Sequence, residues 1–129
     1  MPVKVKNEEE DVKQIAEAIG LLLNREVSIE KGKGGYEYLL YPAGEKDRIA
    51  SIFPKKDETT GEPYYYTQLF YNVLSYLERE KDPARQFFSL YLLESTTVAI
   101  LGHLKGFEIT HLEVSAISFV FYIKRQSSA

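Results

Sequence analysis

The stretch from Tyr64 to Glu80 constrains the fold more than any other, because its apolar side chains repeat at helical spacing. This spacing is typical of one face of an amphipathic α-helix. Pro63 directly precedes the stretch, and proline is favoured at the first position of a helix. We therefore predict a helix from Pro63 to about Lys81, against which the rest of the chain packs. Its apolar face consists of Tyr66, Leu69, Phe70, Val73, Leu74 and Leu77.

A second helix is predicted near the N-terminus. Residues 1–6 are expected to form a tail or an edge strand, and Asn7 is the predicted N-cap. The acidic run Glu8–Asp11 then falls in the first helical turn, where the helix dipole stabilises negative charge. Capping explains this run better than a metal cluster does. The helix should end near Asn24, and its apolar face consists of Val12, Ile15, Ala16, Ile19, Leu22 and Leu23.

After this helix the apolar period changes from about 3.6 to 2, which indicates strands. Three alternating segments follow, each bounded by glycine, proline or polar turn formers. They predict a three-stranded antiparallel meander with short connections. The predicted strands are Arg25–Glu30, Tyr36–Tyr41 and Arg48–Phe53, with turns at 31–35 and 43–47 and stops at Pro42 and Pro54.

A third helix is predicted to start at Asp82 and Pro83, which have the chemistry of an N-cap and a first helical residue. It continues to a stop at Lys105-Gly106. Helix-disfavouring residues at 95–97 leave a second possibility, in which the helix breaks there and 97–101 forms a short strand. The continuous helix is the favoured prediction.

The last predicted element is a strand from Leu112 to Lys124, apolar on both faces toward its end. At about 3.3 Å per residue it would be about 43 Å long, well beyond usual strand lengths. Either it is bulged or broken, or it extends past its own sheet to another subunit. The predicted fold is a single α+β domain of order α-β-β-β-α-α-β, with a helical hairpin on the sheet and a second tail at 126–129.

Composition excludes several kinds of chemistry. The chain has no cysteine, which excludes disulfides, thiolate catalysis and cysteine zinc sites. Its two histidines, His103 and His111, lack companions at metal-ligand spacing, and no P-loop or nucleophile elbow is present. Glu37, set in an aromatic strand, is the carboxylate whose pKa burial could raise. We predict no cofactor and no metal, and an enzyme is the least favoured class.

The surroundings of the protein follow from the same composition. The N-terminal residues are polar and acidic, and no apolar run reaches the length of a membrane span. A cytoplasmic location without membrane contact is therefore expected. The scarcity of Asn, Gln and Met beside abundant Lys and Glu is typical of thermophile proteins.

Ten tyrosines are the unusual feature of the sequence, and tyrosine is enriched at protein interfaces. The leading hypothesis is a non-enzymatic protein-binding, adaptor or regulatory module that forms a homodimer and binds another protein. The candidate interface residues are Tyr65, Asn72, Tyr76, Phe119, Phe121 and Ile123. The alternative is a single-stranded nucleic-acid-binding protein, which the net charge of −3 disfavours. Its candidate surface consists of Lys31, Lys33, Tyr36, Tyr38 and Arg48.

Overall fold

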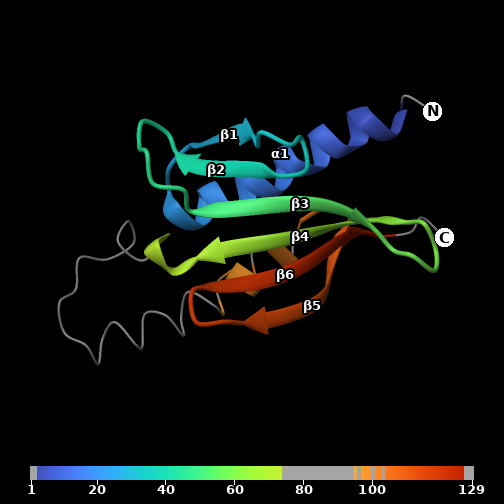
Figure 1. Ribbon diagram of the computed structural model, residues 1–129. Coiled ribbons are helices and arrows are strands. Elements are labelled where there is room, and N and C mark those ends of the chain that lie inside the picture. Colours follow the sequence, from blue (N-terminus) through green and yellow to red (C-terminus); the bar gives the residue numbers. More distant parts are fainter. Residues whose placement is uncertain (1–2, 74–94, 96, 100, 103, 127–129) are drawn as a thin grey trace.

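The computed structural model describes residues 3–73, 95, 97–99, 101–102 and 104–126 (Figure 1). The fold is α+β, with an N-terminal helix and a six-stranded antiparallel sheet of order β1-β2-β3-β4-β6-β5. The elements are α1 (Val3–Leu23), β1 (Val27–Lys31), β2 (Tyr38–Pro42), β3 (Ala50–Lys56), β4 (Pro63–Phe70), the 3₁₀ turn η1 (Tyr71–Val73), β5 (Phe107–Val114) and β6 (Ser118–Arg125).

Helix α1 starts earlier than predicted, at Val3. The predicted N-cap at Asn7 is therefore wrong, and so is the tail or edge strand over its described residues, 3–6. The segment from Val3 to Lys6 contains no helix-breaking residue, so the helix extends back through it.

The C-terminal end of α1 lies where the sequence predicts it, and Asn24 adopts a left-handed conformation with φ of 53°. The Asn24 N–H donates to the Leu21 carbonyl (3.3 Å), and the Arg25 N–H donates to the Gly20 carbonyl (3.1 Å). These two bonds form a Schellman motif, which satisfies carbonyls that the helix end leaves open.

The antiparallel meander of β1, β2 and β3 is confirmed. One detail is wrong, because β3 continues through Pro54 to Lys56 instead of stopping at Pro54. The pairing of β3 with β2 ends at Ile52, whereas its pairing with β4 continues. Pro54 therefore lies where one side of β3 is free, which is where a sheet tolerates proline.

The helix predicted from Pro63 to Lys81 is wrong over its described part. Residues 63–70 form β4, which pairs with β3 on one side and β6 on the other. Its buried side chains alternate with partly exposed ones, and Tyr65, Thr67 and Leu69 are the buried set. Tyrosine, phenylalanine and threonine favour strands, and pairing on both sides outweighed the helical spacing. Residues 74–81 lie outside the described residues.

The long terminal strand is broken, as one of the two alternatives required. Its segments β5 and β6 form a hairpin around Ser115–Ile117. The Ser115 hydroxyl accepts from the Ser118 N–H (3.1 Å) and the Ile117 N–H (3.3 Å). Such local side-chain bonds stabilise turns over continued strands. The other alternative, a long strand that extends past its own sheet to another subunit, is therefore not supported.

The described residues between η1 and β5 are helical at Ser95, Thr97–Ala99 and Leu101–Gly102. This agrees with the favoured continuous helix and excludes a strand over its described positions. Gly106 follows with a φ of 80°, which suits a helix stop. The predicted start of this helix at Asp82 lies outside the described residues.

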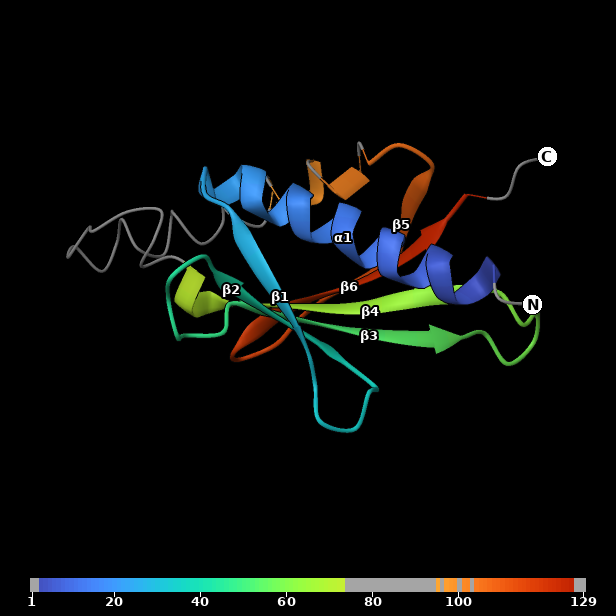
Figure 2. The same ribbon diagram turned by 90° about the horizontal axis from the view of Figure 1, so that it is seen from above.

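Helix α1 and the helical residues 95, 97–99 and 101–102 lie on the same face of the sheet (Figure 2). The core lies between them and the strands. Its buried members include Val12, Ile15, Ile19, Leu40, Ile52, Leu69, Leu101, Phe119, Phe121 and Ile123.

A buried polar cluster joins α1 to β4 and β6. Asp11 is 2 % exposed, and its carboxylate accepts from the Tyr65 hydroxyl (2.6 Å) and the Arg125 Nε (3.1 Å). The Arg125 guanidinium also lies over the Phe107 ring, 4.7 Å from its centroid. Burial and the bond to Asp11 raise the pKa of Tyr65. The cluster therefore holds a neutral phenol and an ion pair between the helix and two strands.

We expect this phenol to make the protein sensitive to alkali. Because the pKa of Tyr65 is higher in the folded state, its stabilisation is complete below about pH 10 and is lost as the pH rises further. Urea unfolding above that pH measures how the free energy of unfolding falls as the pH rises. For Tyr65→Phe this fall should be smaller than for the wild type, by up to about 1.4 kcal/mol per pH unit. The exposed Tyr36→Phe is the control and should keep the wild-type slope. Equal slopes in all three proteins would contradict the assignment.

Candidate functional site: the open face of the sheet

The candidate site is the sheet face opposite α1, which no described element covers. We call it the open face. Strand pairing places its side chains in rows that run across β3, β4, β6 and β5. The first row is Lys55, Tyr64, Lys124 and Glu108; the second is Phe53, Tyr66, Tyr122 and His111; the third is Ser51, Gln68, Val120 and Glu113.

Ring contacts make the second row continuous. Phe53 meets Tyr66 edge-on with centroids 5.8 Å apart, and Tyr66 lies 5.4 Å from Tyr122. His111 meets Tyr122 edge-on at 4.9 Å. Tyr64, from the first row, stacks on Tyr122 at 5.7 Å with 13° between the ring planes. The four aromatic residues other than His111 are partly exposed, so a large apolar surface with polar hydroxyls faces outward.

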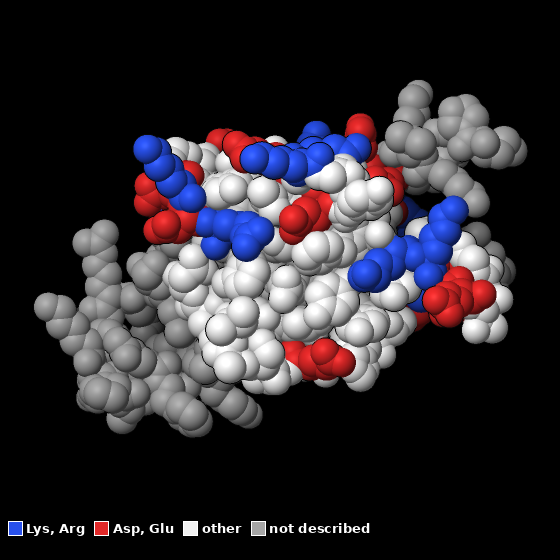
Figure 3. Space-filling model, viewed as in Figure 1, with Lys and Arg blue, Asp and Glu red and all other residues white. Residues whose placement is uncertain are grey.

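Charged groups surround this aromatic surface, with bases toward β3 and acids toward β5. Lys55 of β3 lies 6.0 Å from the Tyr66 centroid. On β5, Glu108 and Glu113 are exposed, and Glu113 lies 3.0 Å from His111. Figure 3 shows a broad uncharged area with basic and acidic side chains gathered around it. The face is thus polarised across the strands.

Lys124 is the base nearest the centre of the face, and its charge is balanced. Its Nζ donates to Glu62 at 2.8 Å, and this bond raises the pKa of Lys124. Partial burial, and then the charge of Glu113, raise the pKa of Tyr122. The face therefore presents a neutral Tyr122 at neutral pH, beside the ion pair of Lys124 with Glu62.

The groups considered for catalysis do not converge on the described part of this face. His111 is exposed, and its ring lies against Glu113 and the Tyr122 ring. Glu37 lies just before β2, outside the strand in which it was predicted, and its carboxylate is 3.9 Å from Arg48. His103 lies outside the described residues. Among the described residues, no group of three His, Asp or Glu side chains could hold a metal ion.

The structure does not bring the predicted interface residues together. Tyr65, Phe119, Phe121 and Ile123 are at most 2 % exposed and lie in the core of the single chain. They belong to the same core cluster as Ile15 and Ile19 of α1 and are therefore not the exposed interface that the sequence suggested. Asn72 is exposed, and its amide donates to the Arg48 carbonyl at 3.0 Å. Tyr76 lies outside the described residues.

The predicted nucleic-acid surface is also dispersed. Tyr38 is buried against α1 and donates to Glu8 at 2.8 Å, so it cannot stack on a base. Tyr36 is 80 % exposed, in the β1–β2 turn with Lys33. Lys31 lies over the Tyr38 ring, and Arg48 lies over Phe70 on the other face. The five residues do not form one surface.

Sequence reasoning missed the open face because it assigned Tyr64 and Tyr66 to a helix. The signal was present as a period of two, since Tyr64 and Tyr66 alternate with buried Tyr65 and Thr67. Tyr122 and Lys124 alternate in the same way with buried Phe121 and Ile123 in β6.

No helix in the described ranges combines the length and apolar character needed to cross a bilayer. No protein-family model, curated protein or solved structure matches this chain. The function is therefore inferred from the geometry of the site.

Proposed function

We propose that the protein is a non-enzymatic protein-binding module that forms a homodimer through the open face. The observation that carries the proposal is the continuous row of Phe53, Tyr66, Tyr122 and His111, which no described element covers. Half-buried aromatic residues surrounded by ion pairs are typical of the centre and rim of a protein interface.

The charge distribution favours a second copy as the occupant. A copy turned about a two-fold axis parallel to the strands would set its β5 over β3 and its β6 over β4. The row register then places Lys55 opposite Glu108 of the second copy, and Tyr66 opposite its Tyr122. Packed sheets of this kind cross at about 30°, so the match is closest near the axis. The arrangement is isologous, as dimer interfaces usually are.

Nucleic acid is the less favoured occupant. The bases near the rings have acidic neighbours, with Lys124 bound to Glu62 and Arg48 close to Glu37. Phosphate binding normally requires a basic stripe whose charge is available.

The dimer is tested by sedimentation of the wild type and Tyr66→Glu at micromolar concentration. We expect the wild type to sediment at twice the mass of one chain. Tyr66→Glu should weaken association at least about a hundredfold, because an unpaired buried charge costs several kcal/mol and about 1.4 kcal/mol is tenfold. Tyr36→Glu, in the exposed β1–β2 turn, is the matched control and should remain a dimer.

The register is tested by charge reversal. Lys55→Glu and Glu108→Lys should each weaken the dimer, and the double variant should recover it, since the opposed pair is restored with its signs exchanged. Failure to recover would overturn this arrangement. A monomeric wild type would overturn the dimer, and salt-sensitive oligonucleotide binding that is lost in Tyr66→Ala would assign the face to nucleic acid instead.

A further inference from the structure

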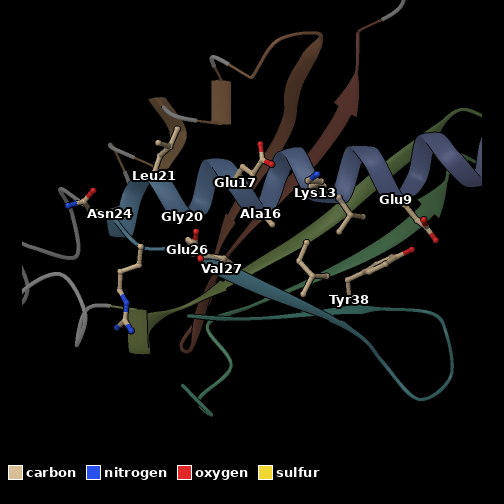
Figure 4. A pocket seen from close by; sticks show the side chains of 13 residues that line it. Glu9, Lys13, Ala16, Glu17, Gly20, Leu21, Asn24, Glu26, Val27 and Tyr38 are labelled. Carbon is tan, nitrogen blue, oxygen red and sulfur yellow. The ribbon is translucent and has the colours of Figure 1, made fainter. Parts of the chain in front are cut away.

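A second surface lies on the α1 side of the sheet, away from the open face. Helix α1 and β1 diverge there and leave a hollow of about 950 Å³ (Figure 4). Apolar Val12 and Ala16 line it from the helix together with charged Glu9, Lys13 and Glu17, and Val27 and Ile29 line it from the strand. Ile29 is 37 % exposed in this hollow, whose exposed lining is mostly apolar. The hollow is therefore a groove beside a strand, mostly apolar but with charged side chains on its helix wall.

The edge of β1 beside this groove has free backbone groups. β1 is the end strand of the sheet. The Glu26 carbonyl accepts from the Ala43 N–H (2.9 Å), and the Gly32 N–H donates to the Glu37 carbonyl (2.8 Å). Backbone direction alternates along a strand, so the even-numbered residues bond to β2. The N–H and C=O groups of Val27, Ile29 and Lys31 therefore point away from the sheet.

Pro42 supports this register. It stands opposite Val27 and has no N–H, which suits a position where the two strands exchange no hydrogen bond. The unpaired row on β1 is thus a consequence of the observed pairing.

We propose that β1 accepts an extended segment of another protein as an added strand. The segment's backbone would pair with Val27, Ile29 and Lys31, which is the usual basis of strand addition at a free edge. Every second side chain of the segment would enter the groove and contact Val12 and Ile29, so these side chains are apolar. The remaining side chains would point to the other side of the sheet and are less restricted.

The geometry favours a bare segment over a second copy at this edge. A second β1 would bring its own α1 to the same side of the sheet, whereas a segment without a helix brings only side chains. The site lies on the opposite side from the open face, so its test is independent of the homodimer.

The test uses a displayed library of random short peptides selected on the full-length protein. We expect enriched peptides in which apolar residues occupy alternate positions. Hydrogen exchange of the wild type with the best peptide should show new protection at the Val27, Ile29 and Lys31 amides, whereas Ser28 and Glu30 are already protected without it. N-methylation of the peptide at the amides that face β1 should weaken binding at least tenfold, and methylation at the alternate amides should not.

A protein variant provides a second readout. Ile29→Glu should weaken the same peptide at least tenfold, and Ile117→Glu, a similar change at an exposed residue of the β5–β6 turn, should leave it unchanged. The proposal is overturned if no alternating peptide is enriched or if the three amides gain no protection. It is overturned in favour of a second copy if Ile29→Glu alters the mass of the assembly while peptide binding is absent.

Discussion

Phe121→Ala is expected to destabilise the protein by about 3–5 kcal/mol, the usual cost of removing a buried aromatic ring. Phe121 is fully buried and lies against Phe119, with ring centroids 6.4 Å apart. Its removal leaves a cavity in the core cluster. Urea unfolding at equilibrium measures the loss.

Two controls separate a core position from an interface. Ile117→Ala, at a residue 63 % exposed, should change stability by no more than about 0.5 kcal/mol. The effect of Phe121→Ala should also be the same when it is introduced into Tyr66→Glu, which we expect to be monomeric. A loss seen only in the dimeric background would mean that Phe121 acts between subunits and not within one chain.

Asp11→Ala is expected to cost about 2–4 kcal/mol, because it removes the common acceptor of the Tyr65 hydroxyl and the Arg125 guanidinium. Arg125 is partly exposed and can turn to water, which keeps the cost below that of a fully buried pair. The Tyr65 side chain is buried and cannot turn to water. Urea unfolding at neutral pH measures the change.

The neighbouring Glu10→Ala is the matched control, since Glu10 is an exposed acid on the same helix turn. It should change stability by no more than about 0.5 kcal/mol. Asp11→Asn keeps an oxygen acceptor, so its loss of stability should lie between those of Asp11→Ala and Glu10→Ala. If Asp11→Ala and Glu10→Ala behaved alike, the buried cluster would not hold the helix to the sheet.

Parts of the fold are predictable because local spacing and tertiary environment agree there. The apolar residues of α1 repeat at helical spacing in the sequence, and the structure buries them on one face. Val12, Ile15 and Ile19 are examples. The meander is equally accessible, since alternating segments and glycine turns indicate the same hairpins that strand pairing then forms.

The sequence is ambiguous at β4, where two periods overlap. Leu69 belongs both to the helical series with Tyr66 and Val73 and to the strand series with Tyr65 and Thr67. The choice depends on pairing with β3 and β6, which is a long-range property. The open face was missed for the same reason, because a row of side chains across four strands can be recognised only when the register of those strands is known.

β6 lies inside the sheet although it is the last strand along the chain. Its partner β4 is separated from it by a long stretch of chain, and their pairing joins Phe70 to Ser118. The pairs among β1, β2, β3 and β4 form between neighbours in sequence, whereas the β4–β6 pair must close a loop of almost fifty residues. Closing such a loop costs chain entropy before any contact is gained, which slows folding. We therefore expect the folding rate to be limited by the pairing of β6, together with β5, with β4. Until that pairing forms, one edge of the aromatic strand β4 has no partner strand.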